Sequence, residues 1–259
     1  MTSSMASVSL PKAPSHVLSL KSRAQTTSII KSKSTVIIRA HQRGSSGIKP
    51  KSEAQFLYAD HMRDSRVALV VAAGAAGSGK TLLAIDAAIN ALEVGDVRKI
   101  VIARPVVSAG EELGFLPGTI EDKMRPWLLP LYDAMDKRTS SGKVRSMMES
   151  GRLELCPIAH MRGRTFDDAF VIVDEVQNVT DTQFRMVVTR IGIGSKLVLT
   201  GDPSQVDLPH GKSGLIDFLD RYERSNAVQT DSHVRVVRLT ADDCVRHPVV
   251  REMLELYDE

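Results

Sequence analysis

The chain has 259 residues, of which 42% are hydrophobic and 25% charged, a balance typical of a globular protein with one main domain. The formal net charge of +3 is unevenly distributed, because residues 1–52 hold nine Lys and Arg side chains and no Asp or Glu. Residues 53–259 therefore hold 25 basic and 31 acidic side chains, and this net charge of −6 gives no argument for tight nucleic-acid binding. Cys156 and Cys244 show no metal-ligand spacing and are expected to be buried or half-buried thiols in a reduced compartment.

Residues 1–52 differ in composition from the rest of the chain. They contain 13 Ser and 4 Thr, and no apolar run is long enough for a secretory signal or a membrane span. A basic, hydroxyl-rich and acid-free stretch is typical of an organelle transit peptide, and the absence of Arg before Arg23 favours a plastid over a mitochondrion. The alternative is a disordered basic tail. We expect the folded domain to span residues 53–259, without association with a membrane.

The first strong motif follows the first predicted strand. Residues 53–65 predict a polar helix, and VALVVAA (67–73) predicts a strand covered on both faces. The sequence GAAGSGKT (74–81) then fits the phosphate-binding Walker A pattern G-x-x-x-x-G-K-[ST]. A Leu- and Ala-rich stretch (81–95) predicts a helix that ends at Gly95. Strand, loop and helix thus follow in the order that the motif requires.

The residues of this loop suit a nucleotide phosphate. Backbone N–H groups can surround phosphate oxygens, aided by the positive end of the following helix. Lys80 is expected to reach the β- and γ-phosphates, and the Thr81 hydroxyl is expected to bind Mg²⁺. The alternative is a strand-to-helix turn with a chance lysine. The loop residues predicted to cradle the phosphates are Gly74, Ala75, Ala76, Gly77, Ser78 and Gly79.

The remaining elements alternate between strands and helices. Strands are predicted at 99–103, 153–157, 169–174, 196–202 and 234–239, and helices at 121–136, 142–149, 181–190 and 213–224. Such alternation predicts an α/β fold, a three-layer parallel sheet with helices on both faces and right-handed crossovers. Between the second strand and its helix, RPVVSAGEELGFLPG (104–118) predicts a long loop, and long loops in compact domains often carry function.

Two acids follow the predicted strand FVIVDE (170–175), which is a Walker B pattern. Ligands bind at the carboxyl ends of strands in open α/β sheets. Asp174 is therefore expected to hold Mg²⁺, directly or through water, and Glu175 to act as general base on the attacking water. A strand that ends in two solvated acids is the alternative, which the preceding P-loop disfavours. The adjacent Glu disfavours a small-molecule kinase, and the absence of a guanine-reading N-K-x-D disfavours a GTPase.

A third motif follows the next strand, in LTGDPSQVDLP (199–209). A neutral Gln205 near the γ-phosphate can orient water and sense whether that phosphate is present. The alternative is a Pro/Asp/Ser turn with an exposed Gln. The pattern Gly-Asp-x-x-Gln after a strand is similar to the phosphate sensor of the first motor domain in superfamily 1 helicases.

In finer detail the sequence resembles the PhoH-like family of ATPases, over about residues 53–256 and in the order of that family's motifs. The stretches that carry the resemblance are RPVVSAGEELGFLPG (104–118), MRGRTFDDAF (161–170), IVDEVQN (172–178), TRIG (189–192), LTGDPSQVDLP (199–209) and VRHPVV (245–250). The resemblance implies a single RecA-like P-loop ATPase domain that binds ATP and Mg²⁺.

The resemblance also implies roles for residues outside the strongest motifs. Gln55, with Tyr58 three residues on, is similar to a family motif in which a Gln reads the adenine edge. The alternative is a pair of polar residues on an exposed helix. The family commonly has Pro where this chain has Ala75, and Ala adopts similar φ values, so nucleotide binding is expected to survive.

Two arginines flank Gly163 in MRGRT. Arg162 and Arg164 either contact the phosphate backbone of a nucleic acid or form ion pairs with Asp167 and Asp168. At least one of the two arginines is expected to lie in an ion pair.

Arg246 in VRHPVV is a candidate finger that stabilises charge on the γ-phosphate, in its own site or in that of a neighbouring subunit. The alternative is an ion pair with Asp242 or Asp243. A helicase closes two motor domains around ATP, and this chain has one, so a homo-oligomer is expected. We expect Mg²⁺-dependent ATP hydrolysis that remodels RNA, with single-stranded RNA contacted by Arg162, Arg164 and the loop 104–118. An ATP-dependent switch that acts on a protein partner is the alternative, and the net charge of −6 favours it.

Overall fold

The computed structural model divides the chain into two compact units, residues 1–46 and 47–259. Only residues of the second unit are described here. These are residues 47–105, 120–208, 212–225 and 232–244 with positions 249, 253 and 256, and the side chains of the helix that begins at Ile120 are described from Leu128 on. Within this part of the chain, no helix is long and apolar enough to cross a membrane.

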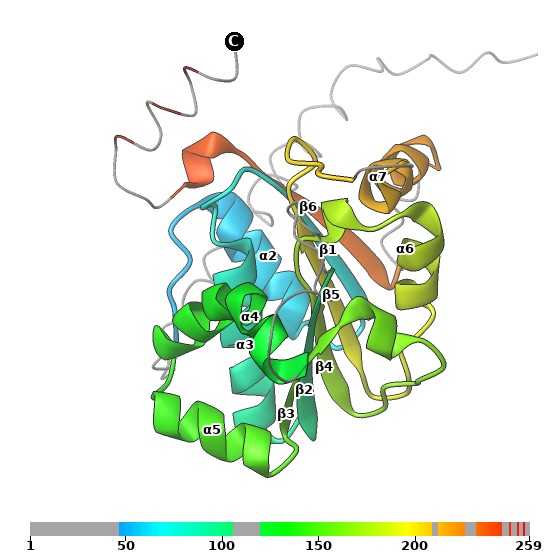
Figure 1. Cartoon of the computed structure of the whole chain (residues 1–259). Helices are drawn as coiled ribbons and strands as arrows, with labels where there is room; N and C mark the ends of the chain where they lie inside the picture. The colour runs from blue at the N-terminus through cyan, green and yellow to red at the C-terminus, as the bar shows by residue number, and fades with distance from the viewer. Residues whose placement is uncertain are drawn as a thin grey trace, which may run out of the picture. The chain divides into compact units, whose positions relative to one another are not determined.

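The described residues form a six-stranded sheet in which all neighbouring strands are parallel (Figure 1). The strands are β1 (Leu69–Gly74), β2 (Lys99–Arg104), β3 (Leu153–Pro157), β4 (Ala169–Val173), β5 (Lys196–Gly201) and β6 (Val234–Leu239). Their order across the sheet is β3-β2-β4-β5-β1-β6. Because the strands are parallel, the residues that follow β1, β2, β4 and β5 all lie at one edge of the sheet.

Helices cover both faces of the sheet (Figure 1). On one face lie α2 (Glu53–Arg63), α3 (Lys80–Val94), α4 (Ile120–Asp136) and α5 (Ser141–Glu149). On the other face lie α6 (Asp181–Val188) and α7 (Gly214–Arg224). Short 3₁₀ turns among the described residues are η2 (Ile158–Met161), η3 (Val176–Asn178) and η4 (Ala241–Asp243). The predicted three-layer α/β fold is confirmed.

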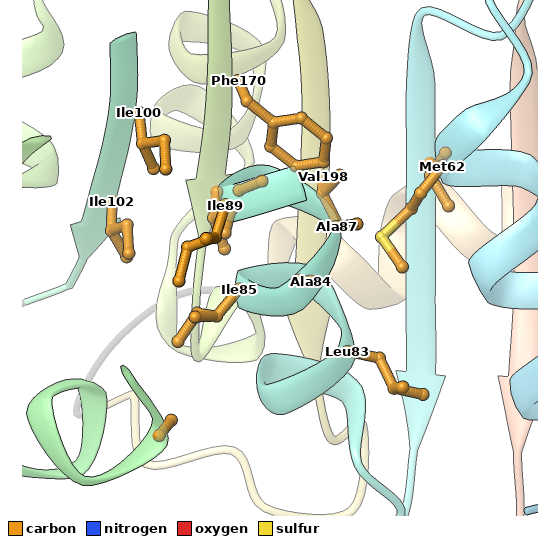
Figure 2. Close-up of a cluster of buried hydrophobic side chains, with 14 of the residues drawn as sticks. Met62, Leu83, Ala84, Ile85, Ala87, Ile89, Ile100, Ile102, Phe170 and Val198 are labelled. Carbon is orange, nitrogen blue, oxygen red and sulfur yellow. The ribbon is translucent and has the colours of Figure 1, made fainter. Parts of the chain in front are cut away.

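The core consists of two apolar layers, because successive strand residues point to opposite faces of the sheet. Figure 2 shows Ile85 and Ile89 of α3 next to Ile100 and Ile102 of β2 and Phe170 of β4. The residues between them on the same strands, such as Val101 and Ala103 of β2, belong to the layer on the other face. Burial of both faces explains why the central strands read as unbroken apolar runs.

The observed helices and strands begin and end within two residues of the predicted bounds. The helix after the P-loop ends at Val94, followed by Gly95 in the left-handed region at φ 85°. Only a residue without a side chain adopts that conformation at little cost, which is why this glycine predicted the stop. α6 begins with a capping box between Thr180 and Gln183, in which each side chain accepts from the other's backbone N–H.

Candidate nucleotide-binding site

The P-loop follows β1 and is fixed against the end of β6. Gly74 has a φ of 149°, and a Cβ atom there would lie 1.7 Å from the carbonyl oxygen of Leu239. The Ala75 backbone N–H donates to the same oxygen at 3.3 Å. Gly77 and Gly79 also have positive φ values, 83° and 86°. These glycines allow the tight turn that aims backbone N–H groups inward, as a phosphate cradle requires.

Lys80 begins α3, and its ammonium group lies over the loop. Its side chain donates to the carbonyl oxygens of Gly74 at 2.5 Å and Ala75 at 2.8 Å. The Ser78 hydroxyl also donates to the carbonyl of Ala75, at 2.7 Å. Lys80 is thus nine-tenths buried and held at the positive end of a helix, where an anionic phosphate is stabilised.

Thr81 and Asp174, the two predicted metal ligands, are in direct contact. The Thr81 hydroxyl donates to Asp174 Oδ1 at 2.7 Å, and the Thr200 hydroxyl donates to the same oxygen at 2.6 Å. Hydroxyl and carboxylate oxygens suit a hard cation such as Mg²⁺, which keeps several waters and takes further oxygens from substrate phosphates. Among the described residues, no cluster of three or more His, Cys, Asp or Glu side chains suited to a metal occurs.

Glu175 follows Asp174 and is held from two sides. Its backbone is left-handed at φ 57°, an uncommon conformation for a residue with a side chain. Its Oε2 accepts from Gln177 Nε2 at 2.6 Å, and its Oε1 pairs with Arg104 Nη2 at 3.2 Å. The carboxylate is 36% exposed, so water can reach it.

Gln177 was not singled out by the sequence, although it connects the two acidic strand ends. It is 1% exposed, and its Oε1 accepts from the backbone N–H of Asp202 at 3.1 Å. A Cβ atom on Gly201 would lie 2.8 Å from that same oxygen, so the glycine leaves room for the amide. The sequence feature that could have identified Gln177 is its position, since it is a polar residue two places after the predicted catalytic Glu175.

Gln205 lies in the loop after β5. Its backbone N–H donates to the carbonyl of Asp202 at 3.0 Å, and the Asp202 carboxylate accepts from the N–H and hydroxyl of Ser204. The Gln205 side chain is exposed and lines the same cavity as the P-loop. Hydrogen bonds to Asp202 therefore hold the base of the loop from which Gln205 lines the cavity.

One cavity of about 590 Å³ joins these motifs. The predicted site residues that line it are Gln55, Ala76, Gly77, Gly79, Lys80, Thr81, Asp174, Glu175 and Gln205. Gly74, Ala75 and Ser78 support the loop through the contacts above. The cavity wall also includes Pro130 and Asp133 of α4, which the sequence did not indicate. It includes Arg104 too, the first residue of the predicted loop 104–118, which the structure places at the end of β2.

Gln55 and Tyr58 are buried, so their interpretation as polar residues on an exposed helix is wrong. Gln55 Nε2 donates to the carbonyls of Ser78 at 3.0 Å and Asp243 at 2.9 Å. The Tyr58 hydroxyl donates to the carbonyl of Lys80 at 3.3 Å, and burial raises its pKa, so it stays a donor. Gln55 thus ties the P-loop to η4 at the edge of the cavity, and its reading of adenine stays a prediction.

The two arginines of MRGRT differ in their surroundings. Arg164 forms a two-pronged ion pair with Glu154, at 2.5 and 2.7 Å, instead of the expected pair with Asp167 or Asp168. That contact holds the pKa of Glu154 below its usual range. Arg162 is exposed. One of the two arginines is thus engaged within the chain, as expected, and the other faces solvent.

Two predicted features lie outside the described residues. These are Arg246 and the part of the 104–118 loop from residue 106 on. Of the cysteines, Cys156 is buried and Cys244 half-buried, as expected, and both are free thiols. Burial raises the pKa of Cys156 to about 11, so this thiol stays protonated and is not a nucleophile.

A family profile described as "PhoH-like protein" matches residues 47–258. The chain belongs to the PhoH-like family. This PhoH-like chain is 44% identical over 213 residues to the PhoH-like protein of Bacillus subtilis, covering 82% of the chain and 64% of that relative. It is 40% identical over 218 residues to Protein PhoH of Escherichia coli, covering 83% and 59%. The chain thus spans about three-fifths of the length of these relatives.

The chain is less similar to solved structures than to these relatives. A bacteriophage large terminase aligns with a TM-score of 0.45 and 14% identity, over 80% of this chain and 50% of its own. The Pif1 helicase of Candida albicans aligns with a TM-score of 0.35 and 15% identity, over 74% and 41%. The family membership, the parallel sheet and the P-loop between β1 and α3 together make the fold that of a RecA-like P-loop NTPase.

Proposed function

We propose that this PhoH-like protein is a Mg²⁺-dependent ATPase that hydrolyses the bond between the β- and γ-phosphates of ATP. The observation that carries the proposal is the meeting of Lys80, the Thr81–Asp174 pair and Glu175 around one cavity. A phosphate cradle, a pair of metal-ligand oxygens and a carboxylate that water can reach are the three parts that phosphoryl transfer to water needs.

Each residue has a distinct task in this reaction. The loop N–H groups and Lys80 bind the phosphates and stabilise the charge that develops on them. Thr81 and Asp174 would hold Mg²⁺, which would supply further charge neutralisation when bound. Glu175 accepts a proton from water while the water oxygen attacks the γ-phosphorus and ADP leaves. Gln205 orients that water.

Phosphate release by the full chain tests the proposal. Glu175→Gln removes the proton acceptor but keeps the shape of the side chain. We expect kcat to fall by at least about 100-fold while ATP binding persists. Asp220→Asn, which also turns a carboxylate into an amide but at an exposed site on α7, is the control and should leave kcat unchanged. Full turnover by Glu175→Gln, or transfer of phosphate to an acceptor other than water, would contradict the proposal.

We further propose that hydrolysis drives RNA remodelling by a homo-oligomer. The exposed Arg162 supports this reading. The net charge of −6 on residues 53–259 and the ion pair of Arg164 support the rival, an ATP-dependent switch that acts on a protein partner.

Single-stranded RNA separates these two uses. Residues 47–259 form a compact unit, so the assay can exclude the basic N-terminus. If RNA raises phosphate release and Arg162→Ala weakens that effect, the RNA reading holds. An unchanged rate, with no RNA binding at low salt, favours the switch. Mass measurement in solution with and without ATP tests the oligomer, and a strict monomer that hydrolyses ATP would exclude it.

A further inference from the structure

Glu175 and Arg104 stand at the ends of neighbouring strands. β2 ends at Arg104 and β4 at Val173, and the two strands pair so that Ala103 lies beside Val173. Arg104 Nη2 lies 3.2 Å from Glu175 Oε1. The pair forms at the edge where the nucleotide cavity opens, and Arg104 lines that cavity.

The ion pair limits what Glu175 can do as a base. Gln177 already occupies Oε2 through its amide hydrogen, at 2.6 Å. Arg104 occupies Oε1, and a guanidinium only donates hydrogen bonds and cannot accept a proton. Each carboxylate oxygen thus already accepts one hydrogen bond and keeps one further acceptor site for water. Release of the Arg104 contact would leave Oε1 fully available to the attacking water.

The Gln177 amide is held at both of its polar atoms. Gln177 is 1% exposed and is also bonded to the backbone of Asp202, so its amide has no room to turn. The Arg104 side chain is 21% exposed and reaches the cavity. Arginine binds phosphate oxygens with the same two-pronged geometry that it uses for carboxylates. A γ-phosphate in the cavity therefore competes with Glu175 for one guanidinium.

We propose that Arg104 is a positioning residue that exchanges between Glu175 and the γ-phosphate of ATP. With the γ-phosphate as its partner, Arg104 releases Oε1 of Glu175 to the attacking water and adds positive charge beside the transferred group. ADP lacks the γ-phosphate and leaves the ion pair intact. The exchange thus frees Oε1 of the base when a hydrolysable nucleotide is bound, and it rests on the ATPase function proposed above.

A double-mutant cycle in nucleotide affinity tests the exchange on the full chain. Dissociation constants are measured with Mg²⁺ for ADP and for AMP-PNP, an ATP analogue that resists hydrolysis. Arg104→Ala should weaken AMP-PNP binding about tenfold and leave ADP binding unchanged. Glu175→Gln should strengthen AMP-PNP binding, because the competing carboxylate is gone. In the double variant this gain should vanish, because no guanidinium remains to be released.

Controls separate the exchange from general effects. Arg98→Ala breaks an Arg–Asp ion pair with Asp168 at 3.3 Å, of similar length but away from the cavity, and should leave both affinities unchanged. Arg104→Lys keeps the positive charge without the two-pronged guanidinium and should give an intermediate loss of AMP-PNP affinity. Thermal melting checks that each variant is folded.

Two results would overturn the exchange. One is an equal loss of ADP and AMP-PNP binding in Arg104→Ala. The other is a gain from Glu175→Gln that persists without Arg104, since simple repulsion between carboxylate and phosphate would then explain it. Because the cycle measures binding, it can succeed or fail independently of whether the wild-type chain hydrolyses ATP.

Discussion

At the scale of single residues, the nucleotide site depends on groups whose type and spacing follow from the chemistry of phosphate and Mg²⁺. Lys80, Thr81, Asp174 and Glu175 follow fixed patterns after buried strands, and the structure brings them to one cavity. Their partners could not be predicted in this way. Gln55 bonds a carbonyl 188 residues further along the chain, so its burial depends on tertiary contacts that no local pattern records.

The structure, and not the sequence, identifies Gln177 as a partner of Glu175, and removal of its side chain should affect turnover more than binding. Gln177→Ala leaves one oxygen of Glu175 without its donor and frees the base to turn away from water. Loss of a hydrogen bond to a charged group is expected to lower kcat about tenfold or more, with KM nearly unchanged. Steady-state phosphate release measures both constants.

A second variant tests the same contact from the other side. Gly201→Ala places a Cβ atom 2.8 Å from Gln177 Oε1, so it should displace the amide and lower kcat in the same way. Gln183→Ala, which removes a Gln from the capping box of α6, is the control and should reduce stability without changing kcat. A raised KM with unchanged kcat in Gln177→Ala would show that Gln177 serves binding instead.

At the scale of elements, apolar runs and stop signals predicted each strand and helix closely. The strands 153–157 and 234–239 have the predicted bounds. The order of strands in the sheet was beyond the sequence, because β1 pairs with β5 and β6 and not with β2, the next strand in the chain. That order depends on how helices cross the sheet, and hydrophobic periodicity carries no record of it.

A buried ion pair joins α3 to the residues just after α4, and removing one of its two charges should lower the stability of the fold substantially. Arg138 lies 2.6 Å from Asp86, with 5% and 3% of the two side chains exposed. Arg138→Met leaves the Asp86 charge buried without its ionic partner, which is expected to cost about 3 kcal/mol. Urea unfolding measures the change in the free energy of unfolding.

The double variant Asp86→Leu/Arg138→Met is the decisive comparison. Because an apolar pair of similar size avoids the desolvation of both charges, it should recover most of the lost stability. The same cost in the single and double variants would show that hydrogen bonds from Arg138 to Asn90 and Glu93, both at 2.9 Å, carry the stability instead.

At the scale of the whole molecule, charge divides the chain into two parts. Residues 1–52 hold nine basic side chains and no acids, and residues 53–259 carry a net charge of −6. The family match begins at residue 47, so the basic stretch lies almost entirely outside the part shared with PhoH-like proteins. A segment that lies almost entirely outside the family match and differs this much in composition favours a separate task.

We propose that this task is import into a plastid. Because residues 1–52 hold no acids, we expect added acidic residues to prevent import. A fluorescent protein that carries residues 1–52 should accumulate in the plastids of a plant cell. Replacing Lys21, Arg23 and Lys31 with Glu keeps the length and the hydroxyl content but removes the acid-free character, so the fluorescence should stay outside. Mitochondrial fluorescence would favour the other organelle, and plastid import of the acidic variant would show that charge is not the signal.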